Sequence, residues 1–464
     1  MPSGSTLRES RLPNAYKKFK HFLSGEIKDL PYVLSIDESP MNNGNSIVCV
    51  LLSTWRHTSV ALTAFFPDGS TNSKLVVESV LATIDEYDLN PRLFRGLCGD
   101  NGSYMVKACE DILQLPHFQN GIFTLPYVRC LAHGLNLFAK SFVEAFPNVD
   151  KLVLNIGSYL KAGQPYKRRQ RYRGCVGGSL SALDVVPTRW SSWLRAVSEI
   201  SNTWDLLISF VKEEETSKRR DKILRLMTVG NAKASIRLIQ RETTLLIRLT
   251  TVSQGVLTKR DISDLETLLV LFQSYSNSGI LQDTEEGRQL LERKLAQYAD
   301  VWSQCPQCNP ALVLHQLEIA GQSCIARWKY ITDTLQIAKT RTLFCPMEDR
   351  SCRMLEYADI FAPIDSELQA EWLRYSALGV IEETNDIFWS DDSVQKDFPL
   401  LFRLATLWLC VPTSSASVER SFSVLKNFHT ANRHQMADSY VAMELILRYN
   451  REYLNNYVLN TLRE

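Results

Sequence analysis

The chain has 464 residues, with 52 lysines and arginines against 51 aspartates and glutamates, 45% hydrophobic residues and 22% charged residues. These proportions are those of a globular protein with roughly two to four domain-sized units, so a wholly disordered chain is excluded. No run approaches the ~18 apolar residues of a membrane span, and the N-terminus has no apolar core of an export signal. We therefore expect no membrane association, and we interpret the 11 cysteines as reduced thiols.

The first part of the chain predicts a hairpin followed by a third strand. Residues 1–30 are polar and basic, and we expect one loose helix there. Three β-rich runs follow, at Tyr32–Asp37, Ser46–Trp55 and Ser59–Phe66. Asn-Gly between the first two runs favours a hairpin, because both residues tolerate a positive φ.

Helical and extended patterns then alternate. Helices are predicted at 73–87, 103–113 and 131–146, and strands at 94–98 and 127–130. This order predicts a mixed sheet with helices packed on it, which is the order of a ribonuclease-H-like fold. From about 150 to 410 the pattern is almost wholly helical, as expected for a helical domain inserted into the α/β domain. The last predicted helices are 398–410, 416–427 and 435–451.

Two aspartates stand at the ends of predicted strands. Asp37 ends the first strand and Asp100 the fourth, and these strands are neighbours in such a sheet. Facing carboxylates repel each other unless they are protonated or bridged by a cation. Mg²⁺ or Mn²⁺ would suit these oxygen ligands and could support phosphodiester chemistry. The alternative is that each aspartate only caps the following segment.

A third acidic residue lies near the C-terminus. Ser414–Leu425 predicts a capped helix with an apolar stripe, and Glu419 lies beside that stripe. A carboxylate at the edge of a buried face needs a partner such as a metal or Arg420. The alternative is a solvated Glu419–Arg420 pair.

Four segments resemble motifs of the hAT transposase superfamily, in the family's order. Leu97-Cys-Gly-Asp100-Asn-Gly-Ser resembles its second-aspartate motif, and Cys130-Leu-Ala-His133 its Cys-x-x-His segment. Pro187-Thr-Arg-Trp190 resembles its Thr-Arg-Trp motif. Ser414–Ser423 with Arg433 resembles its C-terminal dimerisation region. The resemblance covers residues 30–455.

The resemblance implies a catalytic site and its cofactor. Asp37, Asp100 and Glu419 align with an acidic triad that binds Mg²⁺ or Mn²⁺ for DNA strand cleavage and transfer. Glu38 is an alternative to Asp37, but only one of two adjacent strand residues can face the site. Trp190 aligns with a tryptophan that stacks on an extruded base, and Arg189 precedes it. Core packing is the alternative for Trp190.

A basic segment predicts contact with DNA. Residues 161–173 contain six cations, no acid and two tyrosines. Such a segment binds phosphate backbones without reading sequence. A solvated loop or a nuclear import signal is the alternative. The cations are Lys161, Lys167, Arg168, Arg169, Arg171 and Arg173.

Two cysteine motifs have incomplete zinc spacing. Cys130 and His133 have the spacing of half a zinc site, and we expect them to support the acidic site structurally. Cys305 and Cys308 precede His315 and Cys324, so a zinc site and ordinary loop cysteines both stay open. Family members usually begin with a zinc-binding BED finger. Only 36 residues precede Asp37, with one histidine and no cysteine, so we expect no zinc finger there.

The combined interpretation is an α/β plus all-α protein. We expect an N-terminal basic segment (1–30), the first part of a ribonuclease-H-like core (31–190), a helical insertion (191–385), and the completion of the core with a dimerisation region (386–464). The expected function is that of a nuclear hAT-type DNA transposase that binds DNA and forms a homodimer or higher homo-oligomer through its C-terminal region. One alternative is a catalytically silent, domesticated protein that binds DNA and dimerises. Another is a nuclease for RNA–DNA hybrids, which would leave the Thr-Arg-Trp and C-terminal motifs unexplained.

Overall fold

The computed structural model describes residues 7–41, 46–67, 71–100, 102–118, 125, 127–186, 189–276, 284–349, 366–429 and 436–455. Contacts divide the chain into two compact units. We call residues 1–133, 253–259 and 331–464 the sheet unit, and residues 134–252 and 260–330 the helical unit. The domain limits predicted at residues 30, 190 and 385 stay predictions.

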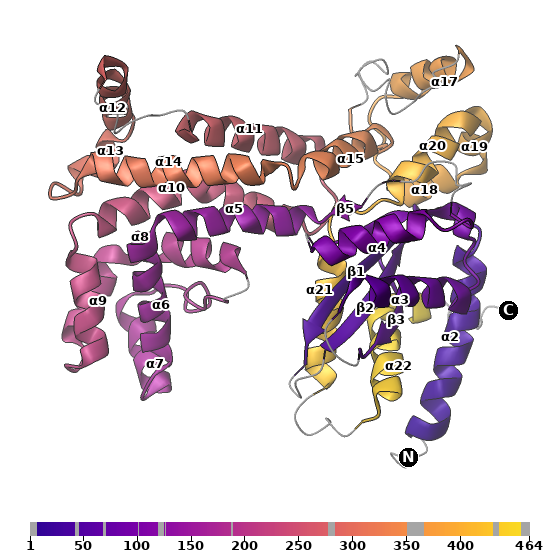
Figure 1. Cartoon of the computed structure of the whole chain (residues 1–464), viewed down its shortest axis with the longest axis horizontal. Helices are drawn as coiled ribbons and strands as arrows, with labels where there is room; N and C mark the ends of the chain where they lie inside the picture. The colour runs from indigo at the N-terminus through magenta and orange to yellow at the C-terminus, as the bar shows by residue number, and fades with distance from the viewer. Residues whose placement is uncertain are drawn as a thin grey trace. The chain divides into compact units, whose positions relative to one another are not determined.

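The sheet unit is built on a five-stranded mixed sheet with the order β3-β2-β1-β4-β5 (Figure 1). Strand β1 pairs antiparallel with β2 and parallel with β4, and β5 runs parallel to β4. The predicted mixed sheet is confirmed, and its order is that of a ribonuclease-H-like core. The strands are β1 (Tyr32–Pro40), β2 (Ser46–Ser53), β3 (Val60–Phe65), β4 (Phe94–Gly99) and β5 (Val128–Arg129).

Strands β1 and β2 form the predicted hairpin pairing, in which Pro40 opposes Ser46. The Asn-Gly pair of the predicted turn lies outside the described residues. Strand β1 runs three residues beyond the predicted end at Asp37, so Asp37 stands inside the paired strand. Its place in the register therefore fixes which face its side chain occupies.

The two faces of the sheet are covered by different helices. Helix α21 (Ala416–Phe428) contacts β1 and β2, and α22 (Asp438–Tyr449) contacts β3. Helices α3 (Ser73–Glu86) and α4 (Ser103–Leu113) pack together on the other side (Figure 1). The short helix η2 (Pro91–Leu93) leads into β4. Segments more than 300 residues apart in the sequence thus enclose one sheet.

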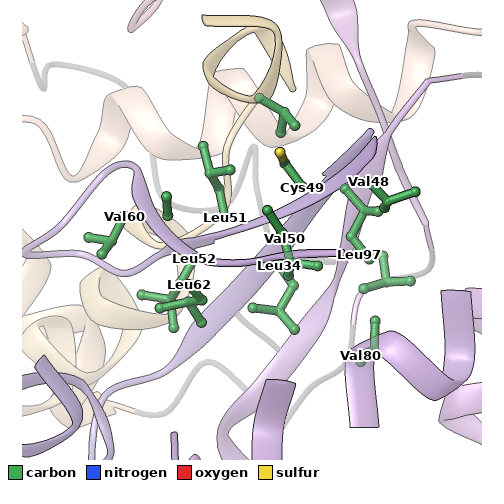
Figure 2. Close-up of a cluster of buried hydrophobic side chains, with 14 of the residues drawn as sticks. Leu34, Val48, Cys49, Val50, Leu51, Leu52, Val60, Leu62, Val80 and Leu97 are labelled. Carbon is green, nitrogen blue, oxygen red and sulfur yellow. The ribbon is translucent and has the colours of Figure 1, made fainter. Parts of the chain in front are cut away.

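Apolar side chains alternate between the two faces. Figure 2 shows Cys49 and Leu51 on one side of β2 and Leu52 on the other, where Leu62 and Val80 of α3 also lie. All of these except Cys49 are at most 1% exposed. Full burial of one such aliphatic side chain contributes about 1.5–3 kcal/mol to the free energy of unfolding. The β-branched residues of β2 favour the strand, and their burial on both faces holds it in the middle of the core.

The expected loose N-terminal helix is instead a packed one. Helix α2 (Leu12–Ile27) follows the π-helical turn η1 (Leu7–Arg11). Phe19, Leu23 and Ile27 recur every four residues, are at most 1% exposed and belong to the same core as the sheet. The expectation of a loose helix is wrong because α22 provides a distant packing surface for this stripe.

A second core of the sheet unit is rich in aromatic rings. Tyr375 lies within 5.9 Å of Phe388, Trp389 and Phe398, measured between ring centroids. The buried Glu371 accepts the backbone N–H groups of Leu400 and Leu401 and so caps α20. The helices of this part are α15 (Thr332–Leu343), α17 (Ser366–Ala377), α18 (Asn385–Ser390), α19 (Asp392–Asp397) and α20 (Pro399–Leu409).

The described residues of the helical unit contain helices and connecting turns. Phe138 packs edge-on against Phe272 and stacks on Trp328, which ties three helices together. No helix in the described part of the chain is long and apolar enough to cross a membrane. The helices are α5 (Leu131–Ala145), α6 (Pro147–Lys161), α7 (Pro165–Cys175), α8 (Trp190–Glu213), α9 (Lys218–Thr228), α10 (Ala232–Val252), α11 (Lys259–Ser276), α12 (Glu285–Gln297), α13 (Ala299–Ser303) and α14 (Pro310–Trp328).

Candidate active site

The register of β1 assigns Asp37 and Glu38 to opposite faces of the sheet. Asp37 is the antiparallel partner of Cys49, so the two side chains share a face. A hydrogen bond between Cys49 and Ser421 of α21 lowers the Cys49 pKa, although burial raises that pKa overall to about 12. Asp37 therefore lies on the face that α21 covers. Glu38 lies on the opposite face.

Asp100 directly follows Gly99, the last residue of strand β4. The Tyr127 hydroxyl donates a 2.7 Å hydrogen bond to the Asp100 carbonyl, and the Cys130 N–H donates a 2.8 Å bond to the Gly99 carbonyl. A β-carbon on Gly99 would overlap the Tyr127 hydroxyl and approach the Ile36 carbonyl to 3.0 Å. Only glycine lets β1 and Tyr127 approach the end of β4 this closely.

The Asp100 carboxylate is partly engaged by its own loop. Its Oδ1 accepts the Gly102 N–H at 2.9 Å, and Gly102 is the N-cap of α4. Asp100 therefore closes the loop before α4 but does not cap the helix, because α4 has no side-chain cap hydrogen bond. Asp37 shows the same pattern, because its Oδ1 accepts the Glu38 N–H at 2.8 Å.

Helix α21 supplies Glu419 from its first turn. The segment before this helix is joined to the end of β5, since the Leu131 N–H donates to the Thr413 carbonyl at 2.9 Å. The Cys130 sulfur accepts the Ser415 N–H at 3.3 Å and lies 3.4 Å from the Ser414 hydroxyl. Cys130 is buried and thereby positions the start of α21 relative to the sheet.

The three acidic residues share one electrostatic environment. The pKa of the half-buried Asp37 is raised to about 7, chiefly by burial and further by the negative charges of Asp100 and Glu419, with Glu38 contributing least. Burial also raises the pKa of Tyr104 of α4, with further contributions from Asp100, Glu38 and Asp37. The structure thus brings Asp37, Asp100 and Glu419 together from three distant segments.

The donor chemistry of this cluster fits a hard divalent cation. Carboxylate oxygens are the ligands that Mg²⁺ and Mn²⁺ prefer, and a cation would relieve the repulsion that raises the Asp37 pKa. Among the described residues, no three His, Cys, Asp or Glu side chains gather closely enough to form a ready-made metal cage. Mg²⁺ does not require one, because it is usually held by one or two carboxylates, waters and substrate phosphates.

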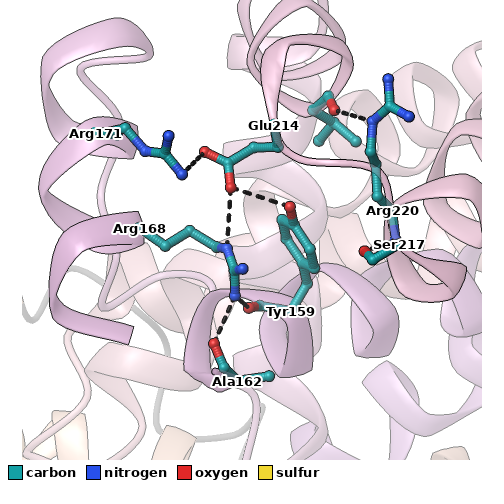
Figure 3. A network of polar contacts seen from close by, with 8 residues as sticks. Tyr159, Ala162, Arg168, Arg171, Glu214, Ser217 and Arg220 are labelled. Atoms are coloured by element: carbon teal, nitrogen blue, oxygen red, sulfur yellow. Dashed lines mark hydrogen bonds and ion pairs between the residues drawn. The ribbon is translucent and has the colours of Figure 1, made fainter. Parts of the chain in front are cut away.

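The predicted DNA-binding segment forms α7, and several of its cations have structural partners (Figure 3). Arg168 and Arg171 pair with the buried Glu214 at 3.1 and 2.6 Å. Arg168 also donates to the Tyr159 and Ala162 carbonyls. Lys161 pairs with Asp184. In the described structure Lys167 and Arg173 are exposed and make no ion pair, whereas Arg169 is half-buried.

Trp190 and Arg189 lie at the start of α8, for which Arg189 is the N-cap residue. The Trp190 ring is half-buried and lies 5.6 Å from the Lys140 ammonium, and the Ser191 N–H donates to the Asn136 side chain at 2.9 Å. Trp190 is thus not enclosed in a core. Pro187 and Thr188 of the same motif, and Arg433 of the C-terminal motif, lie outside the described residues.

The remaining cysteine and histidine candidates have other surroundings. His133 is half-buried in the first turn of α5. Cys305 and Cys308 share a turn, and burial raises the pKa of both thiols, so both are protonated at neutral pH. His315 pairs with Glu318, and the Cys324 sulfur donates to the Phe138 carbonyl. The cysteines of the described ranges are all free.

Sequence reasoning missed Glu214 as the partner of the basic segment. It lies in an acidic triplet, residues 213–215, but its side chain is only 3% exposed. No local signal links the two, because Glu214 lies more than 40 residues after Arg171 in the sequence.

Comparison with protein families matches residues 382–450 to the hAT family C-terminal dimerisation region. This range covers α18 to α22 and includes Glu419. The comparison with curated proteins gives no match.

Proposed function

We propose that this hAT transposase-derived protein cleaves and transfers DNA strands, with Asp37, Asp100 and Glu419 as the residues that hold divalent cations. One observation supports the proposal: Asp37 lies on β1 and Asp100 directly follows the neighbouring strand β4, and the charges of Asp100 and Glu419 add to the burial that raises the pKa of Asp37 to about 7. A structural role does not require such mutual repulsion.

The proposed chemistry rests on how the chain holds its carboxylates. The hydrogen bonds from Glu38 N–H and Gly102 N–H use one oxygen of Asp37 and one of Asp100, and each retains a second oxygen for a cation. The hAT family typically uses a divalent metal. When bound, Mg²⁺ or Mn²⁺ would polarise the phosphoryl oxygens and lower the pKa of the attacking water or hydroxyl.

The proposal extends to DNA contacts and location. Trp190 would stack on an extruded base, and its half-buried ring leaves surface available for this. Arg189 and the exposed cations Lys167 and Arg173 would contact the DNA backbone, whereas Arg168 and Arg171 would mainly hold α7 in place through Glu214. The nucleus is the compartment in which such an activity would meet its substrate.

The test is nicking of supercoiled plasmid by the purified chain with Mg²⁺ or Mn²⁺. We expect the wild-type protein to nick, and Asp100→Asn and Glu419→Gln to lose at least about 100-fold of the rate, because each removes a proposed metal ligand. Glu38→Gln is the matched control: it removes a neighbouring acid from the opposite face and should keep the nicking activity. DNA binding should persist in all variants.

Two outcomes would contradict the assignment. Equal nicking by wild type and Glu419→Gln would show that Glu419 is not a metal ligand. Loss of nicking in Glu38→Gln with retained nicking in Asp37→Asn would assign Glu38, and not Asp37, to the site. A folded, dimeric wild-type protein that binds DNA but does not nick with either metal would favour the silent, domesticated alternative.

A further inference from the structure

A cleft in the sheet unit is lined by arginines and hydroxyl groups. It has a volume of about 100 Å³ and lies beside the first turn of α21, next to the residue that follows Glu419. Two arginines and several hydroxyl groups line it, and the lining contains no aspartate or glutamate. The lining residues that matter below are Gln254, Arg341, Thr413, Ser414, Ser417 and Arg420.

The Arg341 guanidinium has no acidic partner among the described residues. Arg341 lies in the last turn of α15 and makes no ion pair with any described residue, and its Nε has no hydrogen-bond partner there. Burial lowers its pKa, as expected for a cation without a counter-charge. The neighbouring Cys410 cannot provide that charge, because burial raises its thiol pKa to about 12 and keeps it neutral. Keeping a half-buried charged group unpaired is unfavourable unless a partner binds.

A second, independent group lacks a partner in the same cleft. Thr413 is only 3% exposed, and its hydroxyl has no hydrogen-bond partner among the described residues. Buried hydroxyls are almost always satisfied, so this one indicates an absent acceptor or donor. The backbone around it is fixed by the bond from Leu131 N–H to the Thr413 carbonyl.

Arg420 brings a second guanidinium to the mouth of the cleft. Its Nη2 donates to the Ser417 hydroxyl at 2.7 Å and its Nη1 to the Gln254 carbonyl at 3.3 Å. These bonds hold the exposed side chain in place and leave its positive charge without an acidic partner in the lining. The fixed planar fork of arginine suits phosphate oxygens.

We propose that this cleft binds a phosphate group of the DNA backbone, held by Arg341, Arg420 and the Thr413 hydroxyl. The inference rests on the proposed DNA function and names a substrate contact for it. Because Arg420 follows Glu419 in α21, a phosphate held here would fix the DNA strand relative to the helix that carries the third acidic residue. A free phosphate ion offers the same oxygens, so the test has to separate the two sources.

The experiment measures binding without cleavage. The full chain carrying Asp100→Asn is mixed with a fluorescent duplex of about 30 base pairs in EDTA, and anisotropy is followed across a range of KCl concentrations. Adding Arg341→Gln or Arg420→Gln should weaken binding about tenfold and reduce the slope of log Kd against log salt by about one. Thr413→Val should weaken binding less and leave the slope unchanged. Arg451→Gln, on an exposed arginine outside the cleft, is the matched control and should change little.

A second measurement uses inorganic phosphate as the probe. The Tm of the same proteins is compared in phosphate and in KCl of equal ionic strength. A phosphate-dependent rise in Tm that Arg420→Gln and Thr413→Val abolish, together with unchanged DNA affinity, would overturn the DNA contact and assign the cleft to free phosphate. Unchanged DNA affinity, salt slope and Tm response in all three variants would overturn the site altogether.

Two features keep the outcomes distinct. Failure of the nicking test leaves this inference standing, because the binding assay contains no metal and measures binding without cleavage. If Arg341→Gln melts early, Arg420→Gln decides alone, since its side chain is exposed and its loss should not unfold the protein.

Discussion

The raised pKa of Asp37 should make the stability of the chain depend on pH. Burial and the charges of Asp100 and Glu419 raise its pKa from 3.8 to about 7. A raised acid pKa means that the folded chain holds a proton which the unfolded chain releases. Stability should therefore fall as the pH rises from about 4 to about 7, where the unfolded state binds fewer protons.

Asp37→Asn should remove this pH dependence. The variant should be more stable than wild type at pH 8 by on the order of 2 kcal/mol, and the advantage should vanish below about pH 3, where both states carry the proton. Chemical unfolding at several pH values measures this. Mg²⁺ should raise the stability of wild type at pH 8 and leave the variant nearly unchanged.

Glu38→Gln is the control for this effect. It should keep a wild-type-like fall in stability with pH, because Glu38 contributes least to the Asp37 shift. If wild type and Asp37→Asn have the same pH slope, the carboxylates do not interact as described. From the sequence alone, Asp37 and Glu38 could not be separated, because the choice depends on the pairing of β1 with Cys49 of β2.

Side-chain contacts between residues that are distant in the sequence were the hardest feature to predict. The basic segment 161–173 was recognised from composition, but its pairing with Glu214 depends on how α7 packs (Figure 3). The Arg341 Nε and the Thr413 hydroxyl, which have no hydrogen-bond partner among the described residues, could not be predicted either, since neither residue lies in a motif. Charge counts reveal which segment is basic. They do not reveal which of its cations remain available.

At the scale of elements, the end of β4 determines where Asp100 lies. The pairing of β1 with β4 contains a register shift, and Gly96 in β4 adopts a φ of 143°, which favours glycine. The strand then ends at Gly99, against which Tyr127 and the Ile36 carbonyl pack. Two glycines thus allow the strand to bend and to approach its neighbours before Asp100.

Gly99→Ala should damage both stability and the site. The added methyl would overlap the Tyr127 hydroxyl and displace its bond to the Asp100 carbonyl, so we expect a loss of about 2–3 kcal/mol and strongly reduced nicking. Chemical unfolding and the plasmid assay measure the two effects.

Gly25→Ala is the matched control, because nothing lies within 4 Å of its added methyl and it lies inside helix α2. That change should be neutral or stabilising by up to about 1 kcal/mol. Wild-type stability in Gly99→Ala would contradict the close approach.

The strands and helices of the sheet were predicted to within a few residues because their signals are local. Helices predicted at 73–87 and 103–113 are α3 (Ser73–Glu86) and α4 (Ser103–Leu113). Alternating burial, helical spacing and turn residues act over a few positions. The packing of α2 was missed because its partner α22 lies more than 400 residues further along the chain.

At the scale of the whole molecule, the chain completes its sheet with its own C-terminal helices. Helices α21 and α22 of the matched dimerisation region bury Val418, Phe422, Val441 and Leu445 in the core of the sheet unit. Those faces are therefore not available to a second copy. The match suggests homodimerisation, and we expect another surface of residues 382–450 to make the contact.

We expect two exposed apolar side chains near the start of this region to belong to that surface. Ile387, inside the matched region, is 59% exposed, and Val380, just before it, is 58% exposed. We expect the double variant Val380→Ser and Ile387→Ser to weaken the dimer by about ten- to hundredfold, because burial of each aliphatic side chain contributes about 1.5–3 kcal/mol. Sedimentation velocity over a range of concentrations measures the dissociation constant.

Val270→Ser on α11 of the helical unit is the matched control, since Val270 is 63% exposed and lies outside the matched region. An unchanged dimer in the double variant, or equal weakening by the control, would move the interface elsewhere. Thermal unfolding should show no loss of stability in either variant, because none of these side chains belongs to a core.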